Sequence, residues 1–169
     1  YLILNLMFIR ANILSIDDSP LVLHMIKTNL EKAGHTVFSA EDWSEARQYL
    51  KSENSIALVI VDVVLPGFQS GAEMARSLKL HPKLKDTKII FYSSKSPKFL
   101  ERQAKLLRLH GYIHKDVVGA DFVAQVHKII IPPDEVSEET MKNIPPPPPP
   151  PVKPGLRLSQ EMIKRIKSW

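Results

Sequence analysis

The chain has 169 residues, which is enough for one ordinary domain and an appendage. Hydrophobic residues make up 44% of it, so the domain can bury a core. It has no cysteine, which excludes disulfide bonds, thiolate catalysis and cysteine-rich zinc sites and is consistent with a reducing cytoplasm. The formal charge of +5, from 23 basic and 18 acidic residues, is only mildly basic and does not indicate a nucleic-acid partner.

The chain begins with a short apolar stretch, and residues 1–10 are interpreted as a leader or a remnant of cloning. Residues 1–9 are too few to span a bilayer, and they lack the basic start and small-residue cleavage site of a signal peptide. Met7 is taken as the native start; the alternative is an extension of the first strand. We therefore expect a cytoplasmic protein without a membrane span.

Apolar strand-like runs alternate with amphipathic helical patterns over residues 11–132, which we predict to form one domain. Strands are predicted at 12–16, 36–40, 56–61, 88–92 and 112–114, and helices at 20–33, 42–50, 72–80, 97–109 and 120–131. The run at 56–61 is continuously apolar, which is typical of a central parallel strand covered on both faces. This alternation predicts a doubly wound α/β fold, with a five-stranded parallel sheet between five helices.

Start and stop signals support two of these helices. Ser19 and Pro20 suit the N-cap and the first position of helix 20–33, and Gly34 suits its end. Gly111 is expected to stop the helix at 97–109.

The composition changes after residue 132. Residues 133–151 are predicted to be a linker that is first acidic and then polyproline, because 145–151 are seven consecutive prolines. Such a run favours a polyproline II rod, here about 22 Å long. Residues 152–169 form a basic amphipathic tail that could be helical, and it could dock on a partner, on the domain itself or on an anionic membrane surface, or be disordered.

Polar side chains follow four of the predicted strands. Asp17 and Asp18 follow the first strand, Asp62 ends the third, Ser93 follows the fourth and Lys115 ends the fifth. Because the carboxyl ends of parallel strands share one edge, these side chains can converge on one pocket. Three carboxylates there repel one another unless a cation such as Mg²⁺ is bound. Asp62 could then attack a phosphoryl donor, with Lys115 and Ser93 stabilising the transferred group.

The same residues lie in four motifs that resemble the signature blocks of response-regulator receiver domains. These motifs are IDDSP (16–20), VDVVLPG (61–67), YSS (92–94) and GYIHKD (111–116). The resemblance covers about residues 11–131 and implies a flavodoxin-like sheet with strand order 2-1-3-4-5.

By position, the resemblance implies that Asp62 is the phosphoacceptor in a Mg²⁺ or Mn²⁺ site. Asp18 would be a direct metal ligand, Asp17 would act mostly through water, and Val64 would offer its backbone carbonyl. The family is not otherwise enzymatic, since a receiver catalyses only its own phosphorylation and dephosphorylation.

The resemblance also assigns a switch and partners. Ser93 stands where the family has Ser or Thr, Lys115 is the pocket lysine, and Tyr112 matches the aromatic residue whose rotamer reports the switch. A sensor histidine kinase or a phosphotransfer protein would supply the phosphoryl group. A downstream protein would bind the face formed by the fourth helix, fifth strand and fifth helix, or the C-terminal tail; a homodimer is left open, and no direct nucleic-acid contact is expected.

The sequence departs from the family pattern near the pocket. Asp116 stands where the family usually has a proline joined by a cis peptide to the pocket lysine. A cis bond before a non-proline residue costs about 3–4 kcal/mol, so a trans Lys115–Asp116 peptide is expected, with one more negative charge near Lys115. The loop between Pro66 and Gly71 is one residue longer than is common, and Ser70 replaces its usual acidic residue.

Two residues bear on how long a phosphorylated state lasts. Val64 offers no side-chain hydrogen bond to an attacking water, and Lys95 is basic where many rapid members are acidic. We therefore predict slow autodephosphorylation.

Three interpretations of the whole chain follow. It is a single-domain signalling switch, the receiver part of a longer regulator with a DNA-binding or enzymatic part, or an interaction module that is not phosphorylated. The basic residues of the fourth helix region are either a docking face for an acidic partner or a solvated helix side; they are Lys95, Lys98, Arg102, Lys105, Arg108 and His110.

Overall fold

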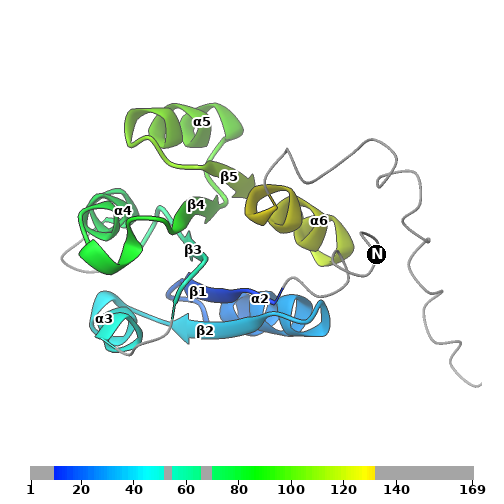
Figure 1. Ribbon diagram of the computed structural model, residues 1–169. Coiled ribbons are helices and arrows are strands. Elements are labelled where there is room, and N and C mark those ends of the chain that lie inside the picture. The colour runs from blue at the N-terminus through cyan, green and yellow to red at the C-terminus, as the bar shows by residue number, and fades with distance from the viewer. Residues whose placement is uncertain (1–9, 52–54, 66–69, 132–169) are drawn as a thin grey trace, which may run out of the picture. The chain divides into compact units, whose positions relative to one another are not determined.

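A computed structural model describes residues 10–51, 55–65 and 70–131 of the chain (Figure 1). The predicted leader, except for residue 10, lies outside the described residues. The predicted polyproline linker and basic tail also lie outside them, so their interpretation stays a prediction.

The centre of the fold is one five-stranded sheet in which every neighbouring pair is parallel. Its strands are β1 (Asn12–Ile16), β2 (Thr36–Ala40), β3 (Leu58–Val61), β4 (Lys88–Ser93) and β5 (Gly111–His114). They lie in the order β2-β1-β3-β4-β5, which confirms the predicted flavodoxin-like topology. The carboxyl ends of all five strands therefore meet at one edge of the sheet.

Helices cover both faces of the sheet. They are α2 (Pro20–Lys32), α3 (Trp43–Lys51), α4 (Gly71–Lys79), α5 (Pro97–Leu106) and α6 (Gly119–Ile130), with a short 3₁₀ helix, η1, at Pro82–Leu84. Buried side chains of α2 and α6 share one apolar cluster, and those of α3, α4 and α5 share the other (Figure 1). None of the helices in the described residues is long and apolar enough to cross a bilayer.

Alternation along the strands divides the core between the two faces. Ile13 of β1 packs in the cluster of α2 and α6, whereas Leu14 and Ile16 pack in the cluster of α3 to α5. All four residues of β3 are buried, as expected of a central strand that is covered on both sides.

Local signals fix where several helices begin and end. The Ser19 hydroxyl accepts a hydrogen bond from the Val22 N–H and caps α2, and Gly34 follows that helix with a φ of +94°. Ser70 forms a capping box with Glu73 at the start of α4. The helix that follows Asp62 in the chain, α4, therefore has a capped N-terminus.

The prediction for the end of the fourth helix was wrong. The helix α5 ends at Leu106, three residues earlier than expected, and Arg108 adopts a left-handed φ of +52°. The Leu109 N–H donates to the Ala104 carbonyl at 2.8 Å, so a turn at Arg108 satisfies the end of the helix. Gly111 does not stop this helix; it begins β5 with a φ of +150°.

Candidate functional site

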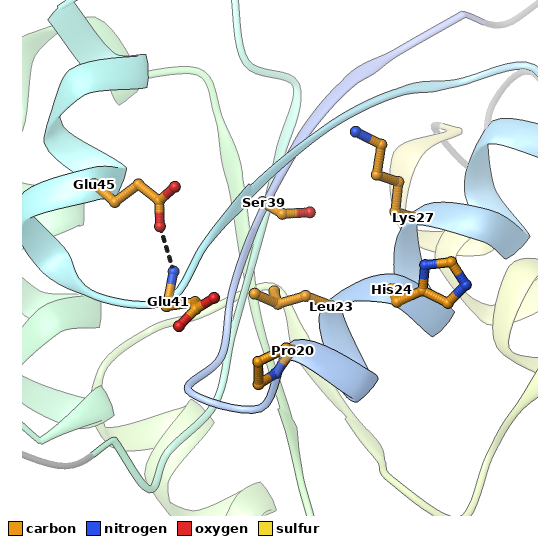
Figure 2. A pocket seen from close by; sticks show the side chains of 7 residues that line it. All are labelled: Pro20, Leu23, His24, Lys27, Ser39, Glu41 and Glu45. Carbon is orange, nitrogen blue, oxygen red and sulfur yellow. Dashed lines mark hydrogen bonds between the residues drawn. The ribbon is translucent and has the colours of Figure 1, made fainter.

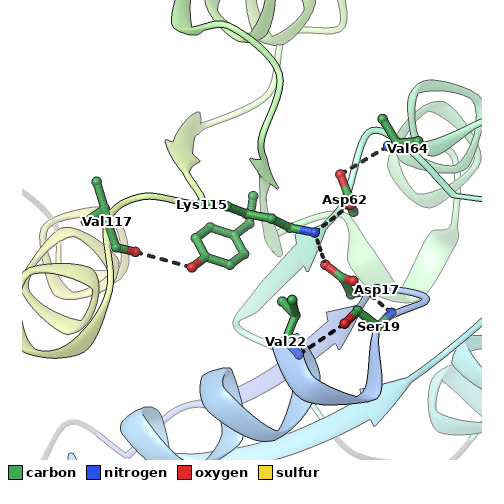
Figure 3. A network of polar contacts seen from close by, with 8 residues as sticks. Asp17, Ser19, Val22, Asp62, Val64, Lys115 and Val117 are labelled. Carbon is green, nitrogen blue, oxygen red and sulfur yellow. Dashed lines mark hydrogen bonds and ion pairs between the residues drawn. The ribbon is translucent and has the colours of Figure 1, made fainter.

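The structure brings four of the predicted residues to the carboxyl edge of the sheet. Asp17 follows β1, Asp62 follows β3, Ser93 is the last residue of β4, and Lys115 follows β5 rather than ending it. Figure 3 shows Asp17, Asp62 and Lys115 pointing toward one another from three different loops. Residues that are far apart in the chain thus form one cluster because their strands are adjacent and parallel.

Backbone hydrogen bonds hold these residues as extensions of the sheet. The Asp62 N–H donates to the Ile16 carbonyl at 3.0 Å, and the Lys115 N–H donates to the Ser93 carbonyl at 3.0 Å. Both bonds continue the parallel pairing beyond the strand ends, so the side chains start from a rigid frame.

Lys115 is the centre of the cluster. Its Nζ lies 2.6 Å from Asp62 Oδ2 and 2.6 Å from Asp17 Oδ2. The contact with Asp62 is a hydrogen bond, whereas the contact with Asp17 is an ion pair whose geometry departs from that of a hydrogen bond. One ammonium group therefore offsets two carboxylates that would otherwise repel each other.

The second oxygen of each aspartate is held by the loop that follows it. Asp17 Oδ1 accepts a hydrogen bond from the Ser19 N–H at 3.0 Å, and Asp62 Oδ1 accepts one from the Val64 N–H at 3.1 Å (Figure 3). Each carboxylate is thus fixed at both oxygens and cannot rotate freely.

Burial and neighbouring charges both shift the pKa values of Asp17 and Lys115. Burial raises the pKa of Asp17, and this outweighs the lowering effect of Lys115 and of the Ser19 N–H. Burial alone would lower the pKa of Lys115, but its contacts with Asp17 and Asp62 raise it above its ordinary value. Lys115 therefore stays charged at neutral pH.

Asp18 completes an acidic cluster that could hold a cation. It is exposed, whereas Asp17 and Asp62 are buried, and one oxygen from each of the three lies within 4.8 Å of the others. Two oxygens that bind the same Mg²⁺ lie at most about 4.2 Å apart, because each Mg–O distance is about 2.1 Å. The three carboxylates fit such an ion after a small adjustment or with one ligand bridged by water.

The Ser93 hydroxyl is buried at the same edge without a partner. Its side chain is 0% exposed, and its Oγ has no hydrogen-bond partner among the described residues. An unpaired buried hydroxyl costs about 1–3 kcal/mol. Such a group is available to a ligand that reaches the cluster.

Three other predicted positions lie near this cluster. Val64 is 48% exposed beside Asp62, and Tyr112 lies half-buried in β5 against the cluster of α3 to α5. The Lys115–Asp116 peptide is trans, as expected, since the described residues contain no cis peptide. The Asp116 side chain is 89% exposed and lies 3.2 Å from the His114 ring; it makes no ion pair with Lys115.

Gly71 and Tyr92 position the site, and their roles were not predicted from the sequence. A Cβ atom on Gly71 would lie 1.8 Å from the Asp62 carbonyl oxygen, so only glycine lets α4 approach the backbone of Asp62 this closely. The Tyr92 hydroxyl donates to the Val117 carbonyl at 3.2 Å and so holds the loop that carries Lys115. Burial raises the pKa of Tyr92 to about 12, so this donor keeps its proton. A tyrosine inside an apolar strand was the available signal, because a buried tyrosine hydroxyl needs a partner.

A pocket lies beside α2 (Figure 2), and neither Asp62 nor Lys115 lines it. It is lined by Pro20, Leu23, His24, Lys27, Ser39, Glu41 and Glu45. It contains none of the three clustered aspartates, and nothing in its lining points to the same chemistry.

Comparisons with known proteins agree with the fold. A family model described as "Response regulator receiver domain" matches residues 13–127. The gliding motility regulatory protein of Myxococcus xanthus is 30% identical over 117 residues, which are 69% of this chain but only 15% of that protein. Protein PilH of Pseudomonas aeruginosa is 28% identical over 120 residues, 71% of this chain and 98% of PilH. The structure of a response regulator from Thermotoga maritima superposes with a TM-score of 0.63 at 28% identity, over 72% of this chain and 98% of that one.

Proposed function

This chain belongs to the response regulator receiver domain family, and from that premise we propose that Asp62 accepts a phosphoryl group with the help of Lys115, Ser93 and a bound Mg²⁺. The observation that carries the proposal is the position of Lys115 Nζ, 2.6 Å from the carboxylates of both Asp17 and Asp62, beside the third carboxylate of Asp18. Receiver domains are signalling switches, and this arrangement supports the same role here.

In the proposed reaction an oxygen of the Asp62 carboxylate attacks the phosphorus of a phosphohistidine on a kinase or phosphotransfer protein. The new O–P bond forms as the P–N bond breaks, and the electron pair of that bond stays on the imidazole nitrogen of the donor. Lys115 already contacts Asp62, and it can follow the transferred group because a flexible ammonium readily changes partner.

The acidic cluster would hold the cation. Asp17, Asp18 and Asp62 would bind Mg²⁺ or Mn²⁺, with the Val64 carbonyl as a further ligand. The ion supplies positive charge that offsets the carboxylates and the phosphoryl oxygens. Without it, an incoming phosphoryl group would face more negative charge than Lys115 can balance.

Ser93 would receive one phosphoryl oxygen. Its buried hydroxyl lacks a partner among the described residues, so a hydrogen bond to the new group removes an existing cost. We propose that this contact draws the end of β4 toward the phosphoryl group. The packing of Tyr112 in β5 would then change, because Tyr112 is paired with Phe91 of β4. The face formed by α5, β5 and α6 would then present the signal to a downstream protein.

Incubation with acetyl phosphate or phosphoramidate and Mg²⁺, followed by intact mass measurement, tests the proposal. The wild-type chain is expected to gain one phosphoryl mass, and Asp62→Asn none. Lys115→Ala should gain it about 100-fold more slowly, as when one stabilising donor is removed from other active sites. Asp116→Asn is the matched control, because that carboxylate is 89% exposed and lies outside the cluster.

The outcomes separate the proposal from its rival, an interaction module that is not phosphorylated. No gain of mass by the wild-type chain, or equal gain by Asp62→Asn, would overturn the proposal. The receiver part of a longer regulator is a second candidate, because the match to the Myxococcus protein covers only 15% of that protein. The match to PilH covers 98% of that protein, and a single-domain switch of the same kind is the first candidate.

A further inference from the structure

The loop between β5 and α6 carries Lys115 on a stretch of chain that is partly at the surface. The loop comprises residues 115–118, and half of its side chains are exposed. Lys115 nevertheless places its ammonium 2.6 Å from the Oδ2 atoms of both Asp17 and Asp62. A lysine side chain is long and flexible, so it keeps two buried acceptors at once most readily when its backbone is held in place.

Local interactions do not fix where this loop lies on the sheet. The Val117 N–H donates to the His114 carbonyl at 2.9 Å, which closes a turn within the loop itself. At the end of the loop, Val118 occupies the N-cap position of α6, and its side chain makes no capping hydrogen bond. The Phe122 N–H lies 3.4 Å from the Val118 carbonyl, which is long for a helical hydrogen bond. The loop therefore depends on contacts with the rest of the fold.

Tyr92 contacts this loop from inside the fold. It is 1% exposed in β4, and its hydroxyl donates to the Val117 carbonyl at 3.2 Å. The centroid of its ring lies 5.0 Å from that of Phe122 in α6, at an interplanar angle of 52°. Packing thus holds the ring, and the hydroxyl meets the loop at a fixed point.

Two adjacent residues of β4 hold the loop at Lys115 and beyond it. The Ser93 carbonyl accepts a hydrogen bond from the Lys115 N–H at 3.0 Å, and the Tyr92 hydroxyl binds the loop two residues further on, at Val117. Because side chains alternate along a strand, Tyr92 packs in the cluster of α2 and α6 while Ser93 ends the strand at the site. The backbone from which the lysine side chain extends is therefore tied to the strand that ends in the site.

We propose that Tyr92 is a positioning residue for phosphoryl transfer, because its hydroxyl fixes the loop from which Lys115 reaches the transferred group. The inference rests on the proposed function of Asp62 and adds to it a residue that touches none of the reacting atoms. Its effect passes through the Val117 carbonyl to the backbone of Lys115. Stabilisation of developing charge depends on a donor that is already in place, so a loop free to shift would lose part of that stabilisation.

Phosphorylation kinetics of the full chain with Tyr92→Phe test the proposal. Phenylalanine keeps the ring against Phe122 and removes only the hydroxyl, so the variant is expected to fold. Intact mass is followed over time with phosphoramidate and saturating Mg²⁺. We expect the rate to fall about tenfold, because the ammonium of Lys115 is misplaced during the chemical step. The Mg²⁺ concentration for half-maximal rate should not rise, because the three carboxylates stay in place.

A double-mutant comparison separates positioning from general damage to the fold. Lys115→Ala alone is expected to react about 100-fold more slowly than the wild type. If Tyr92 acts through Lys115, adding Tyr92→Phe to Lys115→Ala slows the reaction no further, because the residue to be positioned is gone. A merely structural role would instead multiply the two losses to about 1,000-fold.

Thr87→Val is the matched control. Thr87 is buried just before β4, and its hydroxyl donates to the Ile56 carbonyl at 2.6 Å. The variant therefore loses a buried hydrogen bond from a hydroxyl to a carbonyl at the opposite end of the same strand, and it should keep the wild-type rate. Hydrogen–deuterium exchange gives a second readout that needs no phosphoryl donor. The amides of residues 116–119 should exchange faster in Tyr92→Phe and at the wild-type rate in Thr87→Val.

The outcomes distinguish this inference from the proposed function. Equal phosphorylation rates of Tyr92→Phe and the wild type, or losses that multiply in the double variant, would overturn the role of Tyr92 and leave that of Asp62 intact. Unchanged exchange at residues 116–119 in Tyr92→Phe would overturn it as well, because the hydroxyl would then not hold the loop. No gain of phosphoryl mass by the wild type would overturn both.

Discussion

The ammonium of Lys115 compensates the two buried carboxylates of Asp17 and Asp62. Asp17 and Asp62 are almost fully buried, and each contacts the ammonium of Lys115 at 2.6 Å. Removing one partner from such a buried group leaves an uncompensated charge, which costs more than the intact pair contributes. The same contacts raise the pKa of Lys115, so its charge is available whenever the aspartates are ionised.

Gly71 is a second single residue on which the site depends. We predict that Gly71→Ala destabilises the fold by about 3 kcal/mol, because a Cβ there overlaps the Asp62 carbonyl oxygen and Val63 Cα, which are backbone atoms that cannot move aside cheaply. Urea unfolding measures the change. Gly34→Ala is the control: its Cβ meets no atom within 4 Å, and only the positive φ should cost about 1 kcal/mol. Equal losses in the two variants would show that the close approach at Gly71 does not matter.

Val64 tests the predicted lifetime of the phosphorylated state. Its N–H donates to Asp62 Oδ1 and its side chain is 48% exposed, so a side chain at this position can meet solvent beside Asp62. We expect the wild type to lose phosphate over minutes or longer, and Val64→Asn to lose it about tenfold faster, because an amide can orient water. Release of inorganic phosphate from the purified phosphoprotein measures both rates. Val118→Asn, at a similarly exposed valine, should match the wild type, and loss within seconds from the wild type would contradict the prediction.

At the scale of elements, a histidine pair joins α6 to the segment between α2 and β2. The Ala11 N–H donates to His35 Nδ1 at 3.3 Å, so a neutral His35 carries its proton on Nε2. That proton is donated to His127 Nε2, 2.9 Å away. Only uncharged rings satisfy both of these hydrogen bonds. Burial lowers the pKa of both histidines, and a positive charge on His127 would lower the pKa of His35 further.

A lowered pKa means that the folded protein binds the proton less tightly than the unfolded chain does. The pair therefore stabilises the fold above the ordinary histidine pKa of 6.5, and this stabilisation is lost as the pH falls through the lowered values. We predict that the free energy of unfolding in urea drops by about 1 kcal/mol, the value of one hydrogen bond, between about pH 7.5 and about pH 5.

The His127→Gln variant isolates this effect. Glutamine can accept the His35 proton without being titrated, so the drop in stability at low pH should become smaller than in the wild type. His24→Gln changes an exposed histidine of α2 and should keep the full drop. His110, whose pKa is also lowered by burial, contributes equally in all three proteins.

For the whole molecule, the distribution of charge over the fold is uneven. Three aspartates gather at the carboxyl edge of the sheet, while five cations line α5 and its flanking turns. The first group has the chemistry of a site for a divalent cation. Both groups of charges are products of how the strands and helices are ordered.

Mg²⁺ is predicted to stabilise the entire domain. A ligand that binds only the folded state at ten times its Kd raises the free energy of unfolding by about 1.4 kcal/mol. Thermal unfolding followed by circular dichroism should show a higher Tm with Mg²⁺ for the wild type, and no such rise for Asp17→Asn/Asp62→Asn. Asp86→Asn/Asp121→Asn removes two carboxylates outside the cluster and should respond as the wild type does. An equal rise in all three would indicate nonspecific ion binding.

Much of the fold could be predicted from sequence because its signals are local. The alternation of apolar strands with amphipathic helices, the fully apolar β3 and the cap at Ser19 each act within a few residues, and the structure confirms them. The end of α5 was mispredicted for the opposite reason. It is decided by a left-handed turn at Arg108 and by Leu107 and Leu109, which pack against the distant core.

The sequence by itself determined which side chains stand at the strand ends, because a parallel sheet gathers those ends at one edge. Only the tertiary structure decided that Lys115 contacts both aspartates, that Asp116 turns to His114, and that Gly71 touches the backbone of Asp62. These contacts join residues that are far apart in the chain or depend on how a loop turns. They are fixed by the packing of loops and helices on the sheet, and no local pattern of residues encodes that packing.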